Sequence, residues 1–123
     1  MILVDSPIWI DHLREGNAQL ASLLNAENVY CHPLIVGELA MGSLRNRTEF
    51  LKRLDRLKSV PSASLSETRV LIESEKLFSR GIGLIDAMLL ASCLLDRRAR
   101  LWTYDRRLSA CANGLGIAYQ PLH

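Results

Sequence analysis

The chain has 123 residues, of which 49% are hydrophobic, 23% are charged and only four are prolines. This size and composition exclude a disordered or low-complexity chain and predict a single domain over residues 1–123, because hydrophobic cores rarely divide below about 200 residues. The net charge of +2 averages two unlike regions: one base against five acids in residues 1–44 (−4), and fourteen bases against eight acids in residues 45–123 (+6).

Short apolar runs alternate along the chain with longer segments of helical periodicity, which favours an α/β sandwich around a mainly parallel sheet. Strands are predicted at residues 1–4, 28–31, around Val60, at 101–103 and, as an edge strand, at 117–119. Helices are predicted at residues 7–14, 17–25, 33–42, 48–58, 64–80, 85–95 and 105–112. The segment 85–95 is apolar on nearly every face, which is typical of a helix buried by its neighbours.

Three cysteines, Cys31, Cys93 and Cys111, form no CxxC pair and are odd in number. They are therefore expected to be reduced and buried. The first residues lack a basic segment followed by a long apolar run, and no later stretch is long enough to span a bilayer. These features predict a soluble, cytoplasmic protein.

Four carboxylates stand where the predicted fold makes a charge either useful or costly. Asp5 and Asp105 each follow a predicted strand, and ligands bind beyond the carboxyl ends of strands in an open parallel sheet. Glu38 lies in the middle of a helix on a face with apolar residues such as Met41, so it is expected to point inward. Asp86 opens the most hydrophobic helix, where a charge must be capped, paired or bound to a ligand.

A cluster of such carboxylates needs a compensating charge. Two carboxylates about 4 Å apart repel by about 4 kcal/mol at an effective dielectric near 20, so four together require bound cations or raised pKa values. Mg²⁺ or Mn²⁺ is the natural partner, because hard divalent cations select oxygen ligands. When bound, such an ion acts as a Lewis acid and lowers the pKa of a coordinated water.

Each carboxylate also has a purely structural interpretation. Asp5 and Asp105 are well placed to cap the helices that follow them. Asp86 suits the first turn of a helix, where the helix dipole favours an acid, and Glu38 suits an ordinary solvated helix position. What favours a common site is their joint occurrence with small hydroxyls, Ser6 beside Asp5 and Thr103 close to Asp105.

At these positions the sequence resembles the PIN-domain nucleases, and among them the VapC-type toxins of bacterial toxin–antitoxin pairs. The matching segments are LVDSPIWI with Asp5, GELAMG with Glu38, GLIDAMLLASCL with Asp86 and LWTYDRRL with Asp105. They stand in the order typical of the family, near its usual spacing, and cover almost the whole chain.

The resemblance implies a PIN fold, which is a three-layer α/β/α sandwich with a central, mainly parallel, twisted sheet. It implies a Mg²⁺- or Mn²⁺-dependent endoribonuclease whose products carry 5′-phosphate and 3′-hydroxyl ends. The implied catalytic and metal-binding residues are Asp5, Glu38, Asp86 and Asp105, the last binding directly or through water. Ser6 and Thr103 are expected to orient these ligands, although hydroxyls at strand ends are equally typical of turns.

The resemblance also implies a homodimer and a tightly bound antitoxin protein that covers the acidic pocket. Apolar stretches at residues 8–10 and 34–41 offer surface for such a partner. The same residues are equally suited to filling the core.

An RNA substrate requires basic side chains around the acidic centre. The candidates are Arg45, Arg47, Arg98, Arg100, Arg106 and Arg107, and the later members of this set bracket Asp105 in the sequence. Phosphate contacts from such residues give affinity without sequence information, although each also suits a solvated surface position. Without the four carboxylates, fifteen bases face nine acids, and the remaining charge of +6 suits a polyanion.

Other function classes fit less well. His12, His32 and His123 are candidates for acid–base catalysis, but no pair has a spacing that demands proximity. A phosphoacceptor domain needs an acidic pair after the first strand and a lysine after the last, whereas a serine and a proline follow Asp5 and no lysine occurs near the end. A housekeeping RNA-processing nuclease and a non-catalytic RNA-binding relative remain alternatives to a toxin.

Overall fold

A four-stranded parallel sheet forms the centre of the molecule in the computed structural model, which describes residues 1–121. Its strands lie in the order β3-β2-β1-β4. They are β1 (Ile2–Val4), β2 (Val29–Cys31), β3 (Lys58–Ser59) and β4 (Arg100–Trp102). All residues of β1 and β2 are buried, as expected for a parallel sheet covered on both faces. The predicted parallel sheet is confirmed.

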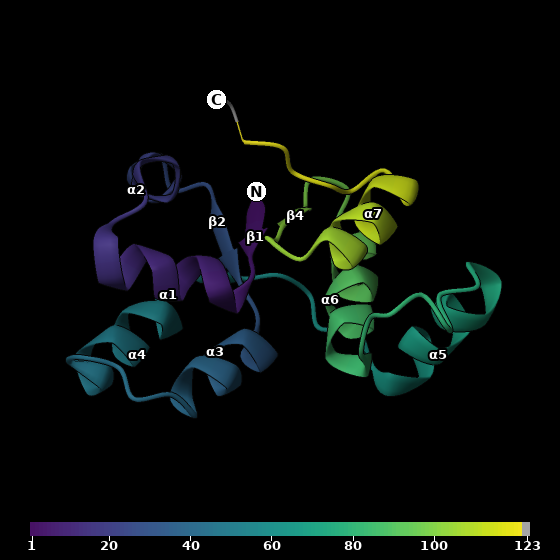
Figure 1. The fold of residues 1–123 in the computed structure, drawn as a ribbon, viewed down its shortest axis with the longest axis horizontal. Coiled ribbons are helices and arrows are strands. Elements are labelled where there is room, and N and C mark those ends of the chain that lie inside the picture. The colour runs from purple at the N-terminus through teal and green to yellow at the C-terminus, as the bar shows by residue number, and fades with distance from the viewer. Residues whose placement is uncertain (122–123) are drawn as a thin grey trace.

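Helices cover the two faces of this sheet, and the predicted three-layer α/β/α sandwich is confirmed. Figure 1 shows α1 to α4 on one side of the sheet and α5 to α7 on the other. The helices are α1 (Ser6–Glu15), α2 (Ala18–Asn25), α3 (Pro33–Ala40), α4 (Arg47–Asp55), α5 (Leu65–Ser74), α6 (Leu84–Leu94) and α7 (Arg106–Gly114).

Two helices end earlier than predicted. The helix expected over residues 48–58 ends at Asp55, because the chain then turns into β3. This strand, expected around Val60, ends one residue earlier, at Ser59. The helix expected over residues 64–80 ends at Ser74, because Lys76 adopts a left-handed backbone with φ of 53°. The expected edge strand at residues 117–119 is reduced to a single parallel bridge between Leu101 and Ala118.

The core is built from both layers around the sheet. Ile8 and Trp9 are 0% and 3% exposed, so these two residues of the first apolar stretch fill the core, whereas Ile10 is only partly buried. The three cysteines are buried and free, as predicted. Burial raises the pKa of the Cys31 thiol to about 11 and that of Cys93 to about 12. No helix within residues 1–121 is long and apolar enough to cross a membrane.

Candidate active site

Asp5 lies at the carboxyl end of the central strand β1 and is 7% exposed. Its Oδ1 accepts a hydrogen bond from the Ser6 backbone N–H (2.9 Å), so Asp5 caps α1. Its Oδ2 accepts one from the Thr103 hydroxyl (2.7 Å), which comes from the neighbouring strand β4. Burial raises the pKa of Asp5 against the effect of these hydrogen bonds, and the charges of Asp86 and Asp105 raise it further. The cap and a functional role are compatible.

Glu38 reaches the same place from α3. The Ser6 hydroxyl donates a hydrogen bond to Glu38 Oε1 (3.0 Å). Partial desolvation of the carboxyl by its neighbours raises the pKa of Glu38, the Ser6 hydrogen bond opposes this, and the charges of Asp5 and Asp86 add to the rise.

The expectation that Glu38 points inward with an apolar face is wrong. Glu38 is exposed and Met41 is 89% exposed, so this side of α3 faces away from the core. The helix buries Ile35 and Leu39 instead. Glu38 is therefore directed along the end of the sheet, toward Ser6, and not into the hydrophobic interior.

Asp86 and Asp105 approach from the helices on the other side of the sheet. Asp86 is half-buried in the first turn of α6, where its Oδ2 accepts the Gly83 backbone N–H (3.1 Å). Asp105 caps α7 by accepting the Leu108 N–H (2.9 Å), and its own N–H donates to the Thr103 hydroxyl (3.1 Å). Both structural interpretations therefore hold, and the charges of both residues act on Asp5.

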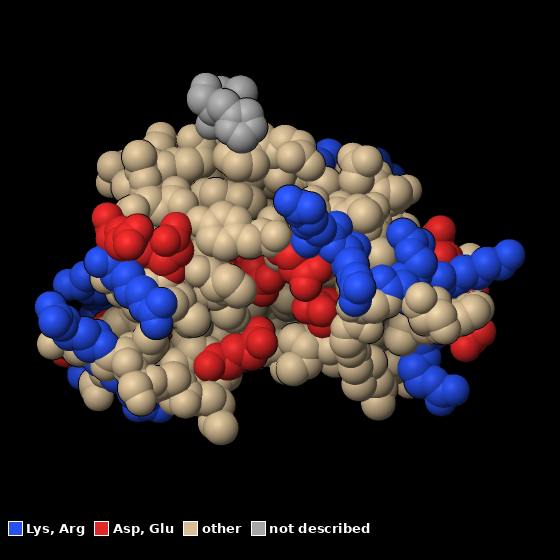
Figure 2. Space-filling view, in the orientation of Figure 1, with Lys and Arg blue, Asp and Glu red and all other residues tan. Residues whose placement is uncertain are grey.

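Two hydroxyls connect the acidic side chains. Ser6 joins Glu38 to the first turn of α1, and Thr103 joins Asp5 to the backbone of Asp105. Figure 2 shows acidic side chains gathered in a hollow at the centre of one face, between the half of the molecule with α1, α3 and α4 and the half with α6 and α7. We call this hollow the acidic centre; its members are Asp5, Glu38, Asp86 and Asp105.

Each carboxylate of the acidic centre accepts a hydrogen bond from an N–H or a hydroxyl group of the chain. In residues 1–121, no three His, Cys, Asp or Glu side chains are placed close enough to hold one metal ion. The sequence had identified all four carboxylates and both hydroxyls. The contact between Ser6 and Glu38 is tertiary and left no signal in the sequence.

Four of the six predicted basic residues divide between the two ends of the sheet. Arg106 and Arg107 open α7 directly after Asp105, and Figure 2 shows basic side chains on the α7 side of the acidic hollow. Arg98 and Arg100 lie at the opposite, amino end: Arg100 pairs with Ile2, and the amino group of the first residue donates to the Arg98 carbonyl (3.1 Å). Arg98 and Arg100 are therefore close to Asp105 in the sequence but lie at the other end of β4.

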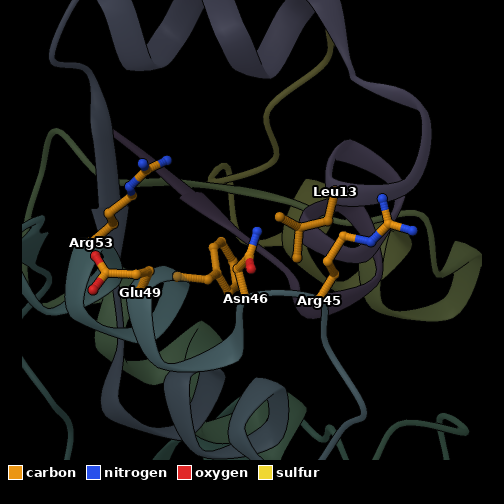
Figure 3. Close-up of a pocket in the computed structure, with 6 residues that line it drawn as sticks. Leu13, Arg45, Asn46, Glu49 and Arg53 are labelled. Atoms are coloured by element: carbon orange, nitrogen blue, oxygen red, sulfur yellow. The ribbon is translucent and has the colours of Figure 1, made fainter.

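Arg47 and Arg45 lie on the other side of the sheet. The Arg47 guanidinium donates to the Ala40 carbonyl through Nε and Nη2 (3.1 and 2.8 Å), which closes the C-terminus of α3. Arg45 lines a cleft of about 290 Å³ between α1 and α4. Figure 3 shows Arg45 beside Leu13 on one side of this cleft and Arg53 on the other.

The two described histidines have structural partners. His32 is 2% exposed, its Nδ1 accepts the Leu34 N–H (3.0 Å), and its Nε2 lies 3.0 Å from Ser92 Oγ. Burial lowers its pKa. His12 Nδ1 accepts the Asn17 N–H (3.0 Å). His123 lies outside the described residues.

The raised pKa of Glu38 predicts a pH-dependent gain in stability for Glu38→Gln. A carboxyl whose pKa is raised by folding costs no stability below its unfolded pKa, and the cost appears as pH rises through the folded pKa. Without metal, Glu38→Gln is therefore expected to melt above wild type at pH 7, by about 2 °C because solvent screens an exposed group, and at the same temperature near pH 3. Equal melting temperatures at both pH values would contradict this.

Comparison with known proteins shows the family to which the chain belongs. A family model described as PIN domain matches residues 2–114, a span that contains the whole acidic centre and both hydroxyls. Two curated proteins named Ribonuclease VapC32, from Mycobacterium tuberculosis strains CDC 1551 / Oshkosh and ATCC 25618 / H37Rv, are each 43% identical over 118 residues. The match covers 96% of this chain and 95% of each relative.

Proposed function

Because the chain belongs to the PIN-domain family and is of the VapC type, we propose that it is a Mg²⁺- or Mn²⁺-dependent endoribonuclease that acts as the toxin of a toxin–antitoxin pair. The observation that carries the proposal is the acidic centre at the carboxyl edge of the sheet, where Ser6 and Thr103 connect carboxylates from distant segments. The 43% identity to proteins named Ribonuclease VapC32 supports RNA as the substrate.

The oxygen donors of the acidic centre are of the kind that a hard divalent cation prefers, and binding one ion would require at least three of the side chains to move closer together. All four members offer carboxylate oxygens, which Mg²⁺ and Mn²⁺ prefer over nitrogen and sulfur. The raised pKa values of Asp5 and Glu38 mean that the folded protein disfavours their negative charges, and a cation would offset that cost. When bound, the ion supplies a Lewis acid for the phosphodiester and lowers the pKa of a nearby water.

The chain's own groups orient these carboxylates and hold the RNA. The Thr103 hydroxyl fixes the position of Asp5 Oδ2, and the Ser6 hydroxyl does the same for Glu38 Oε1. Such orienting partners typically change metal affinity or activity by about 10–100-fold when they are lost. Arg106 and Arg107, which follow Asp105, hold backbone phosphates at the rim.

The toxin role adds a protein partner and a second copy of the chain. The cleft between α1 and α4 combines Leu13 and Phe50 with two guanidinium groups and one carboxylate, those of Arg45, Arg53 and Glu49 (Figure 3). This combination suits an antitoxin segment that carries apolar and acidic side chains. Exposed apolar side chains at Val70 and Leu84, which are 68% and 51% exposed, offer surface for the homodimer.

Metal removal tests the proposed activity. Wild-type protein treated with EDTA is expected to leave a labelled RNA intact, and addition of excess Mg²⁺ or Mn²⁺ to restore cleavage with 5′-phosphate and 3′-hydroxyl products. The measurement is the cleavage rate on a gel together with identification of the product ends. Cleavage at the full rate in EDTA would contradict the proposal.

A further inference from the structure

We propose that a cleft beginning at Thr103 and passing between α2 and α7 binds the unpaired bases of single-stranded RNA beside the acidic centre. The proposal rests on the proposed function and adds the part of the substrate that the protein recognises. We call this feature the Tyr104 cleft.

The Tyr104 cleft consists of two adjoining hollows of about 350 and 370 Å³. They share Thr103, Tyr104, Ser109 and Gln120. One hollow extends toward the start of α2, and the other runs along α7. Both volumes lie in the range of about 300–1,000 Å³ that is usual for ligand sites, so each hollow has room for a base.

Thr103 connects the cleft to the acidic centre. Its hydroxyl donates to Asp5 Oδ2 (2.7 Å) and accepts from the Asp105 N–H (3.1 Å), while the same residue lines both hollows. An RNA strand with a phosphate at the acidic centre would therefore have a neighbouring base at Tyr104. Arg106, which lines the hollow along α7, lies at the rim to meet the next phosphate.

Tyr104 offers a prepared stacking surface. The side chain is 50% exposed, yet its hydroxyl is held at both sides: it donates to Asp11 Oδ2 (2.7 Å) and accepts from Asn17 Nδ2 (3.2 Å). Tyr119 lines the hollow that extends toward the start of α2, and its ring packs edge-on against that of Trp102, with 5.6 Å between the ring centroids. Unpaired RNA bases are recognised by stacking on such aromatic side chains. Because hydrogen bonds already hold the Tyr104 side chain, its ring loses little conformational entropy when a base binds.

The polar lining matches the edges of bases. The side chains of Ser109, Asn113 and Gln120 make no hydrogen bond to another residue within 1–121, so their donors and acceptors are available. Amide and hydroxyl groups of this kind pair with the Watson–Crick edges of splayed bases. The described lining contains no leucine, isoleucine, valine or carboxylate. A groove that binds an apolar peptide helix is lined by aliphatic side chains, so this cleft does not resemble one.

Binding of short RNAs tests the proposal apart from cleavage. Fluorescence anisotropy in EDTA, with labelled octamers of uridine, adenosine and cytidine, measures affinity while the RNA stays intact. Tyr104→Ala is expected to weaken binding about tenfold, and Tyr104→Phe, which keeps the ring, to stay within threefold of wild type. The double variant Asn113→Ala/Gln120→Ala is expected to reduce the preference among the three octamers.

Two controls keep the outcome clear. Asn25→Ala removes an exposed amide outside the cleft and is expected to bind like wild type. Melting temperatures identify a variant that fails to fold, and because Asn113 and Gln120 are exposed, the double variant carries the test if Tyr104→Ala unfolds.

The proposal is overturned if wild type binds none of the octamers, or if folded Tyr104→Ala and the double variant both bind as wild type does. The proposed ribonuclease function fails separately. A protein that binds RNA through the Tyr104 cleft but never cleaves it would contradict that function alone. Cleavage that is unchanged in every cleft variant would contradict the cleft alone.

Discussion

Replacing Asp5 with asparagine is expected to lower the rate of RNA cleavage by about a thousandfold and to leave the fold intact. Asparagine has nearly the same volume and keeps an oxygen for the Ser6 N–H that begins α1. It removes the negative charge, however, and presents an NH₂ group to Thr103 or to a cation where Asp5 presents an acceptor. A thousandfold corresponds to about 4 kcal/mol, the scale of charge stabilisation that a metal site contributes to a transition state.

The measurement is single-turnover cleavage of a labelled RNA, with circular dichroism melting to verify folding. Glu15→Gln is the matched control, because Glu15 is exposed on the same helix α1 and undergoes the same change in charge. It is expected to cleave at the wild-type rate. Folded Asp5→Asn that retains more than about one tenth of wild-type activity would show that Asp5 has only its capping role.

The positions of Asp5 and Asp105 were predictable because they depend on a general rule of parallel sheets. Each follows the carboxyl end of a strand, and the observed pairing of Val4 with Trp102 makes those two ends neighbours. Asp86 was predictable from its place in the first turn of an almost wholly apolar helix. In each case the local pattern already determines the position of the backbone.

The direction of Glu38 was not predictable in the same way. Ile35 and Leu39 lie on α3 and the apolar Met41 caps its C-terminus, and periodicity alone does not decide which of these residues faces the core. The decision depends on packing against the sheet, which buries Ile35 and Leu39 and leaves Met41 at 89% exposure. Contacts such as that of Ser6 with Glu38 depend on this tertiary choice.

Distance along the chain was also misleading for the basic residues. Arg100 and Asp105 are close in sequence, but Arg100 begins β4 and Asp105 follows its carboxyl end, so about 7 Å of strand separates the two ends. The residues of the Tyr104 cleft, in contrast, are far apart in the sequence and close together in the fold. They come from α2, α7 and the segment after β4, so only the folded structure brings them together.

The proposed function depends on a divalent cation bound at the acidic centre, and the dependence of the melting temperature on Mg²⁺ or Mn²⁺ measures that binding. Mg²⁺ or Mn²⁺ at about 100 times its Kd should add about 2.7 kcal/mol to the free energy of unfolding, or about 10 °C to the melting temperature. The shift should shrink as pH falls, because protons compete for carboxyls whose pKa is raised by burial and by neighbouring charges.

The comparison that decides the matter is the metal-induced shift in melting temperature of wild type, Glu15→Gln, Asp5→Asn and Asp86→Asn at pH 7. The account predicts the full shift in wild type and Glu15→Gln, and less than about 2 °C in the two variants of the acidic centre. No shift in wild type, or an equal shift in all four proteins, would contradict it.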